Sequence, residues 1–238
     1  MLAAAPDGYT ISIMTGDTFG TQAAGKPNWK FSDITPVAIM IKQPSAFFVP
    51  ANSPIKNWND LVAEAKKRPL KVAVTGFGTP DDITVNYFTK KGTNLLSVPF
   101  ANPGERYTAI LGGHADLLYE QLGDVKSFLE SKQMRPIVIF DTQRFPLFPD
   151  VQTCVEIGSP VIINPFRMVT VKAGTDAQRI KVLADALAKV AASSDFKAYL
   201  ADQYADPKSY MSAADAQGFL ANELANMKKF AREAGMTQ

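Results

Sequence analysis

The residues best suited to catalysis or metal binding are scarce in this chain. His114 is the single histidine and Cys154 the single cysteine among 238 residues. A structural zinc site needs several cysteine or histidine ligands, and a Cys–His nucleophile pair needs both groups in one place. One cysteine also excludes an internal disulfide, so cysteine usage does not identify the compartment. We therefore expect no metal site and no cofactor.

A carboxylate pair is the remaining candidate for acid–base chemistry. Asp116 and Glu120 lie on or next to a short predicted strand at residues 115–119. Two carboxylates can divide the roles of general acid and general base. No nucleophile accompanies this pair, so we expect no enzymatic activity, although fold analogy alone does not exclude it.

Two segments have the form of a helix start that follows a strand. Each combines a capping residue, a proline at the first helical position and a carboxylate in the first turn: Thr79-Pro80-Asp81-Asp82 and Asn102-Pro103-Gly104-Glu105. Helix N-termini present free N–H groups and a partial positive charge. In open α/β sheets, ligands bind beyond the carboxyl ends of the strands. These two helix starts therefore predict a site for an anion.

The elements that must position these residues alternate between strand and helix. Apolar and β-branched runs predict strands at residues 9–14, 34–41, 46–49, 70–75, 95–100, 115–119, 135–140 and 166–171. Capping residues predict further helices after Asn57, Thr175 and Ser212, and an apolar stripe predicts one near residues 125–129. Residues 142–159 are rich in turn formers and predict a surface loop. The alternation indicates an α/β fold with largely parallel sheets.

Composition narrows the possible partners. The formal net charge of +2 is too small to indicate a nucleic-acid partner. No apolar run approaches the roughly 18 residues of a membrane span, so we expect no insertion into a membrane. Met1 is followed by Leu-Ala-Ala-Ala-Pro, which has neither the basic start nor the apolar core of a signal peptide.

Several segments, read in order, resemble one protein family. They are Ala5-Pro6-Asp7-Gly8-Tyr9-Thr10, Asp33-Ile34-Thr35-Pro36-Val37-Ala38, Leu111-Gly112-Gly113-His114-Ala115-Asp116, Pro149-Asp150-Val151-Gln152-Thr153 with Glu156-Ile157-Gly158, and Phe166-Arg167 with Ala173-Gly174-Thr175. This order resembles the extracytoplasmic solute receptors of tripartite tricarboxylate transporters, also called Bug receptors. By this resemblance, His114 stabilises the end of a helix.

The resemblance implies a two-lobed periplasmic-binding-protein type II architecture, the Venus flytrap. Residues 1–43 and 139–238 would form lobe 1, and residues 44–138 would form lobe 2. Residues 39–50 and 135–140 would cross between the lobes, and a small organic acid would be held in the cleft.

The chain departs from the family pattern in two places. Judged by the resemblance, the chain would lack the first strand, glycine-rich loop and helix that usually precede the motif at residues 5–10. The loop at residues 73–79 has Ala73-Val74 in place of the usual Gly-Ser pair, and Asp82 stands where the family often has a histidine. The sequence therefore leaves the identity of the ligand open.

The candidate ligand-binding residues surround the two helix starts or follow other predicted strands. In chain order they are Thr15, Asp17, Thr18, Thr75, Gly76, Gly78, Thr79, Asn102, Gly104 and Arg167. Backbone N–H groups and hydroxyls near residues 75–79 and 102–104 would meet a ligand carboxylate. Arg167 would pair with a distal carboxylate.

Each candidate has a structural alternative that the sequence leaves open. Gly76 and Gly78 also suit a tight turn between a strand and a helix. Residues 15–18 suit a solvated loop, and Arg167 suits a surface or inter-lobe salt bridge. Asp81 and Asp82 would compete with an anion for the same N–H donors, either as helix caps or as partners of a ligand ammonium group.

Two functions fit this pattern. The first is a periplasmic receptor that captures a small mono- or dicarboxylate, an amino acid or an aromatic acid for separately encoded transporter subunits. The alternative is the ligand-sensing effector domain of a LysR-type regulator, which shares the two-lobed topology. Such a domain normally follows a helix-turn-helix, which this chain lacks, and the tracts at residues 5–10 and 112–116 fit receptors better.

Overall fold

The computed structural model describes residues 1–24 and 29–236. The strands are β1 (Ile11–Thr15), β2 (Ile34–Lys42), β3 (Ser45–Pro50), β4 (Leu70–Val74), β5 (Leu95–Pro99), β6 (Leu117–Gln121), β7 (Met134–Phe140), β8 (Phe166–Lys172) and β9 (Met211–Ser212). The helices are α1 (Gly16–Ala24), α2 (Trp58–Ala65), α3 (Pro80–Lys90), α4 (Pro103–Leu111), α5 (Lys126–Glu130), α6 (Ala177–Ala192), α7 (Ser194–Asp202) and α8 (Ala213–Glu233), with a short 3-10 helix at Phe31–Asp33.

The strands form two separate sheets. One has the order β1-β8-β2-β9 and the other the order β5-β4-β6-β3-β7. All pairs of the first sheet are antiparallel, and in the second only β4 pairs in parallel, with β5 and β6. The expectation of largely parallel sheets is therefore wrong. Parallel neighbours need a helical crossover, and here only α3 and α4 supply one, between β4, β5 and β6.

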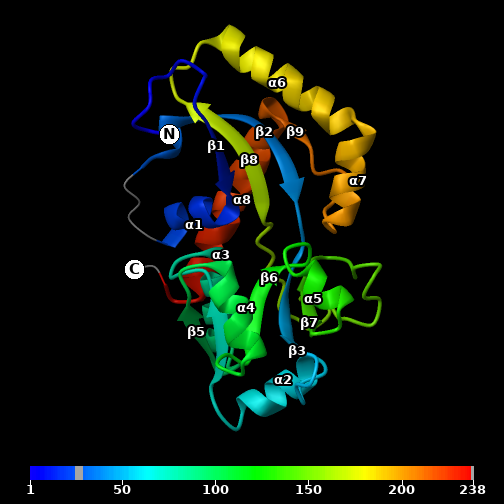
Figure 1. The fold of residues 1–238 in the computed structure, drawn as a ribbon. Helices are drawn as coiled ribbons and strands as arrows, with labels where there is room; N and C mark the ends of the chain where they lie inside the picture. Colours follow the sequence, from blue (N-terminus) through cyan, green and yellow to red (C-terminus); the bar gives the residue numbers. More distant parts are fainter. Residues whose placement is uncertain (25–28, 237–238) are drawn as a thin grey trace.

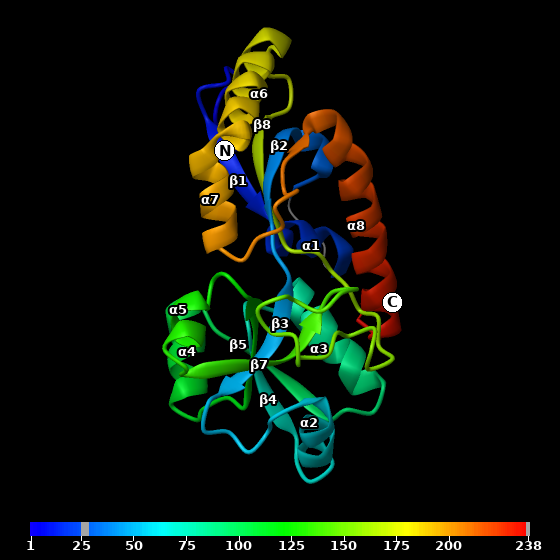
Figure 2. The same cartoon turned by 90° about the vertical axis from the view of Figure 1, so that its right-hand side faces the viewer.

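Each sheet is the centre of one lobe (Figure 1). In the four-stranded lobe, α6 and α7 cover one face of the sheet and α1 and α8 the other, as the rotated view makes clear (Figure 2). In the five-stranded lobe, α2 and α3 cover one face and α4 and α5 the other. The fold is thus the α/β two-lobed architecture that the sequence predicts.

The alternation of side chains along β3 explains why both faces of its sheet are buried. Phe47 belongs to the core beneath α2 and α3, whereas Phe48 belongs to the core beneath α4 and α5. Successive residues of a strand point to opposite faces. A strand covered on both sides is therefore expected to be largely apolar, and β3 reads Ser-Ala-Phe-Phe-Val-Pro, in which the buried Ser45 hydroxyl donates to Tyr119.

The chain passes between the lobes where β2 gives way to β3, at Gln43 and Pro44, and again along residues 141–165. Residues 141–165 contain no helix or strand apart from an isolated bridge between Thr153 and Ile139. The loop predicted at residues 142–159 lies within this segment, but it is not a surface loop throughout, because Thr153 and Cys154 are buried. The pairing of β7 with β3 extends to Phe140. The lobe boundaries at 43/44 and 138/139 stay a prediction.

The lobes also touch away from these crossings. Tyr87 of α3 and Phe230 of α8 meet edge to face, with ring centroids 5.6 Å apart. A Cβ on Gly20 of α1 would lie 2.9 Å from Pro80 of α3, so this close approach requires glycine. One apolar core therefore continues from one lobe into the other.

The helix starts follow the sequence closely, with two corrections. The side chains of Asn57, Asn102 and Ser212 each accept a hydrogen bond from the backbone N–H three residues later. Helix α6 is capped by Asp176 and not by Thr175, whose hydroxyl donates to the Lys172 carbonyl. Thr79 occupies the cap position of α3, but its hydroxyl caps no N–H group. No helix in the described ranges is long and apolar enough to cross a membrane.

Candidate ligand-binding site

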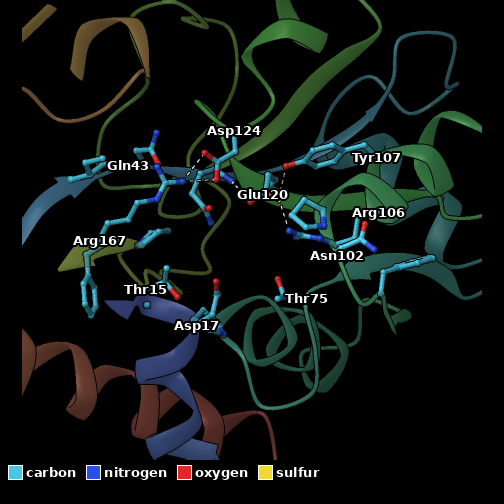
Figure 3. Close-up of a pocket in the computed structure, with 18 of the residues that line it drawn as sticks. Thr15, Asp17, Gln43, Thr75, Asn102, Arg106, Tyr107, Glu120, Asp124 and Arg167 are labelled. Carbon is cyan, nitrogen blue, oxygen red and sulfur yellow. Dashed lines mark hydrogen bonds and ion pairs between the residues drawn. The ribbon is translucent and has the colours of Figure 1, made fainter. Parts of the chain in front are cut away.

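A cavity of about 210 Å³ lies at the junction of the two lobes. Its wall comes from the ends of β1, β2 and β8 in one lobe and from β4, α4 and β6 in the other. The polar residues that line it are Thr15, Asp17, Gln43, Thr75, Asn102, Arg106, Tyr107, Glu120, Gln121, Asp124 and Arg167 (Figure 3). A concave site with a few converging polar groups is typical of small-molecule binding sites.

Asp17 is the carboxylate that the four-stranded lobe contributes to the lining of the cavity, among the described residues. It follows β1 in the first turn of α1, and its carboxylate points into the cavity (Figure 3). No residue within 1–24 or 29–236 forms a hydrogen bond or ion pair with this carboxylate. Burial raises the pKa of Asp17 to about 6, and the nearby Asp81 carboxylate contributes to the shift. Asp17 is thus an acid that the fold holds in a recess without a counter-charge in contact.

Side chains of α3 bind N–H groups of the glycine loop that precedes this helix. The N–H of Thr75 donates to the Asp81 carboxylate, and the N–H of Gly78 donates to Asp82 at 2.8 Å. The Thr79 hydroxyl lies within hydrogen-bonding distance of two acceptors, the Gly76 carbonyl at 2.6 Å and the Asp81 carboxylate, and its one hydrogen serves one of them at a time. The carboxylates of α3 therefore occupy two of the N–H donors that the sequence assigns to a ligand anion.

Hydrogen bonds within the first turn of α4 likewise bind groups at the start of that helix. The Asn102 side chain accepts from the Glu105 N–H at 3.0 Å and donates to the Glu105 carboxylate at 2.8 Å. The same carboxylate accepts from the Ala101 N–H at 3.3 Å. Asn102 still reaches the cavity, whereas Gly104 lines a separate, open hollow on the surface with His114.

The floor of the cavity contains a buried ion pair. Arg106 of α4 and Glu120 of β6 meet at 2.8 Å, and their side chains are 7% and 4% exposed. The Tyr107 hydroxyl donates to Glu120 at 3.0 Å, as does the Gln121 N–H at 3.1 Å. Burial raises the pKa of Glu120 to about 7, although the Arg106 guanidinium opposes that shift. Burial and the adjacent Glu120 carboxylate also raise the pKa of Tyr107.

A second ion pair spans the cavity between the lobes. One guanidinium nitrogen of Arg167, in β8, contacts both oxygens of Asp124, in the turn after β6, at 2.7 and 2.9 Å. The two side chains are 30% and 25% exposed. With its amide nitrogen turned toward the acids, Gln121 lies 3.0 Å from both Asp124 and Glu120.

The structure separates the two acids that the sequence suggests for acid–base work. Asp116 binds Arg68 at 2.7 Å and accepts from the Lys71 N–H at 2.8 Å, on the outside of the lobe. Glu120 lies in the cavity with Arg106. The pair Asp116 and Glu120 therefore forms no common site. Within residues 1–24 and 29–236, no cluster of histidine, cysteine and acidic side chains could hold a metal ion.

Half of the predicted ligand-binding residues line this cavity. Those that do are Thr15, Asp17, Thr75, Asn102 and Arg167; those that do not are Thr18, Gly76, Gly78, Thr79 and Gly104. Roles in binding stay predictions for all ten. Sequence reasoning missed the lining residues Gln43, Arg106, Tyr107, Gln121 and Asp124. None of these five belongs to a motif, and only the meeting of α4, β6 and the β2–β3 crossing brings them together.

Two α/β lobes with a polar cavity at their junction are the architecture of periplasmic-type solute-binding proteins, although the fold alone does not fix the function. The family model described as "Tripartite tricarboxylate transporter family receptor" matches residues 1–236. This chain therefore belongs to the tripartite tricarboxylate transporter receptor family.

Individual relatives agree with that membership. A UPF0065 protein of Cupriavidus necator is 26% identical over all of this chain and 73% of its own length. A UPF0065 protein of Bordetella bronchiseptica is 29% identical over 76% of this chain and 55% of its own length. The match thus spans between about half and three quarters of these two relatives.

Solved structures show the same fold. The structure of R. palustris Rpa4515 with adipate has a TM-score of 0.90 and 24% identity, and the match covers 98% of this chain and 80% of that one. MatC (Rpa3494) from Rhodopseudomonas palustris with bound malate has a TM-score of 0.84 and 22% identity, and covers 96% and 81%.

Proposed function

We propose that this chain is the extracytoplasmic receptor that captures a small organic acid for a tripartite tricarboxylate-type transporter. The observation that carries the proposal is the polar cavity at the junction of the two lobes, with ionisable groups contributed by both. Membership of the receptor family and the ligands of Rpa4515 and MatC, adipate and malate, support a carboxylate ligand. The same membership favours a receptor over the effector domain of a regulator.

Capture would proceed by closure of the lobes on the ligand. The ligand carboxylate would take the place of Asp124 beside Arg167, while the Thr15 and Thr75 hydroxyls would bind its remaining oxygens. Charge-assisted hydrogen bonds of this kind are the strong ones. The closed form, in the periplasm, would then dock on membrane subunits of the transporter, and no bond of the ligand would be broken.

A ligand screen tests the proposal. Thermal shift and calorimetry would compare mono-, di- and tricarboxylates, aromatic acids and amino acids. A ligand at a hundred times its dissociation constant adds about 2.7 kcal/mol of stability. Arg167→Ala should weaken binding about tenfold or more, whereas Arg68→Ala, which breaks an ion pair outside the cavity, should leave it unchanged. Failure of every acid to bind, or chemical conversion of the bound ligand seen by NMR, would contradict the proposal.

A further inference from the structure

The charges that line the cavity do not match a ligand made only of carboxylates. Three carboxylates and two guanidiniums line it, the acids being Asp17, Glu120 and Asp124. Arg106 is already paired with Glu120, and Arg167 with Asp124. A dicarboxylate would bring two further negative charges to a cavity whose two positive charges are both balanced.

The neutral donors are also largely committed. The N–H of Thr75 donates to Asp81, and the side-chain amide of Asn102 donates to the Glu105 carboxylate. A carboxylate needs donors or positive charge at each end to replace the water it loses. The cavity offers one end that meets this need, where Arg167 can exchange Asp124 for a ligand. At the other end stands Asp17, which accepts hydrogen bonds and donates none when ionised.

We infer that the ligand carries a positively charged amino group as well as a carboxylate, and that Asp17 receives the amino group. This inference rests on the proposed function and narrows its ligand class to zwitterions. Asp17 is the cavity carboxylate that has no partner in the described residues, and it points at the space a ligand would fill (Figure 3).

The positions of the two ends fit a short zwitterion. Arg167 and Thr15 are directly opposite each other in the β1–β8 pairing. Asp17 follows Thr15 by two residues and faces the same cavity (Figure 3). The ligand carboxylate would lie between Arg167 and Thr15, and the amino group would lie a few bonds away at Asp17.

A purely structural role for Asp17 makes different predictions. Asp17 lies in the first turn of α1, where a carboxylate stabilises the helix dipole. If stabilisation of α1 were its only role, Asp17→Asn would lower the melting temperature and leave the choice of ligand unchanged. A ligand-binding role instead predicts a changed ligand choice without a loss of stability.

The test uses pairs of compounds that differ only in the terminal group. Succinate and β-alanine, glutarate and γ-aminobutyrate, and adipate and δ-aminovalerate each share the same number of methylene groups. Calorimetry would measure each pair, together with the wider panel of acids and α-amino acids, on the wild-type chain, on Asp17→Asn and on Asp185→Asn. Asp185 is the matched control, because it lies on the exposed face of α6 and pairs only with Lys181.

We expect an amino compound to bind the wild-type chain most tightly and to lose about tenfold or more in affinity on Asp17→Asn, with Asp185→Asn unchanged. Tightest binding by a diacid or simple monoacid, or an amino ligand indifferent to Asp17→Asn, would overturn this inference and leave the receptor function intact. Failure of every compound to bind would overturn the receptor function and this inference together.

Discussion

Two arginine–carboxylate pairs line the same cavity in opposite settings. Arg106 and Glu120 belong to one lobe and are almost completely buried, and Tyr107 adds a further hydrogen bond to the glutamate. Arg167 and Asp124 come from different lobes, and each keeps at least a quarter of its side chain exposed. Geometry alone does not distinguish them, because the shortest N–O distances are 2.8 and 2.7 Å.

The difference in burial determines what each pair can do. Separating a buried pair leaves a charge in a medium that cannot solvate it, whereas an exposed pair exchanges its partner for water at little cost. Arg106–Glu120 is therefore a fixed part of the cavity wall. Arg167–Asp124 is the pair that a ligand can open.

The largest expected effect is on the buried pair. Arg106→Ala leaves Glu120 buried without its counter-charge, and we expect it to lower the free energy of unfolding by about 3–5 kcal/mol near pH 8. The loss should be smaller near pH 5. Without the guanidinium, the pKa of Glu120 rises further, so the folded variant holds a neutral glutamic acid at that pH and loses less stability.

Urea unfolding at both pH values measures this difference. The matched control is Arg68→Ala, which breaks a half-exposed pair with Asp116 in the same lobe and should cost less than about 1 kcal/mol. Equal losses for the two variants would show that burial does not distinguish these pairs.

The second effect concerns the unpaired acid. Burial and the Asp81 carboxylate raise the pKa of Asp17 from 3.8 to about 6, while the Arg106 and Arg167 guanidiniums lower it and the Asp124 carboxylate raises it further. A raised carboxyl pKa means that stability is fully present below about pH 4 and is lost as the pH rises through about 6. Asp17→Asn avoids this loss but gives up a helix-dipole contribution. We expect it to be more stable than the wild-type chain by about 1 kcal/mol near pH 8.

Urea titrations across this range would measure the free energy of unfolding of the wild-type chain and of Asp17→Asn. We expect the difference between the two to grow between about pH 4 and pH 6. Asp185→Asn should show no such difference. A variant that is less stable than the wild-type chain at every pH would mean that Asp17 serves mainly to stabilise α1.

Local signals explain the part of the fold that the sequence predicted. The caps at Asn57, Asn102 and Ser212 depend on contacts within four residues. Such a pattern therefore predicts a helix start whatever the rest of the fold is. Strand direction depends on which distant strands become neighbours. The antiparallel pairing of β1 with β8 joins residues more than 150 positions apart, and no local pattern encodes it.

The cavity was predictable to a similar, limited degree. Thr15 is the last residue of β1 and Thr75 directly follows β4, and the general rule for α/β sheets directs attention to such positions. Arg106 lies in the middle of α4, where an arginine reads as a solvated surface residue until the helix is seen to cover β6. The N–H groups of Thr75 and Gly78 donate to Asp81 and Asp82 in the structure. The sequence could not predict this, because the same spacing also allows these N–H groups to bind a ligand.

The smallest expected effect on stability concerns the inter-lobe pair. Asp124→Asn removes the charge that holds Arg167, and we expect it to change the free energy of unfolding by less than about 1 kcal/mol. A ligand carboxylate then competes with no protein carboxylate for the guanidinium, so affinity should rise about threefold to tenfold. Calorimetry with the tightest ligand measures the gain. Asp202→Asn is the control, because Asp202 forms another inter-lobe pair, with Lys126, outside the cavity.

Two acids of one cavity would thus have opposite effects, since Asp17→Asn weakens and Asp124→Asn strengthens the binding of the same zwitterion. If both substitutions weakened binding, Asp124 would itself contact the ligand. The hypothesis that the ligand carboxylate replaces Asp124 beside Arg167 would then be wrong.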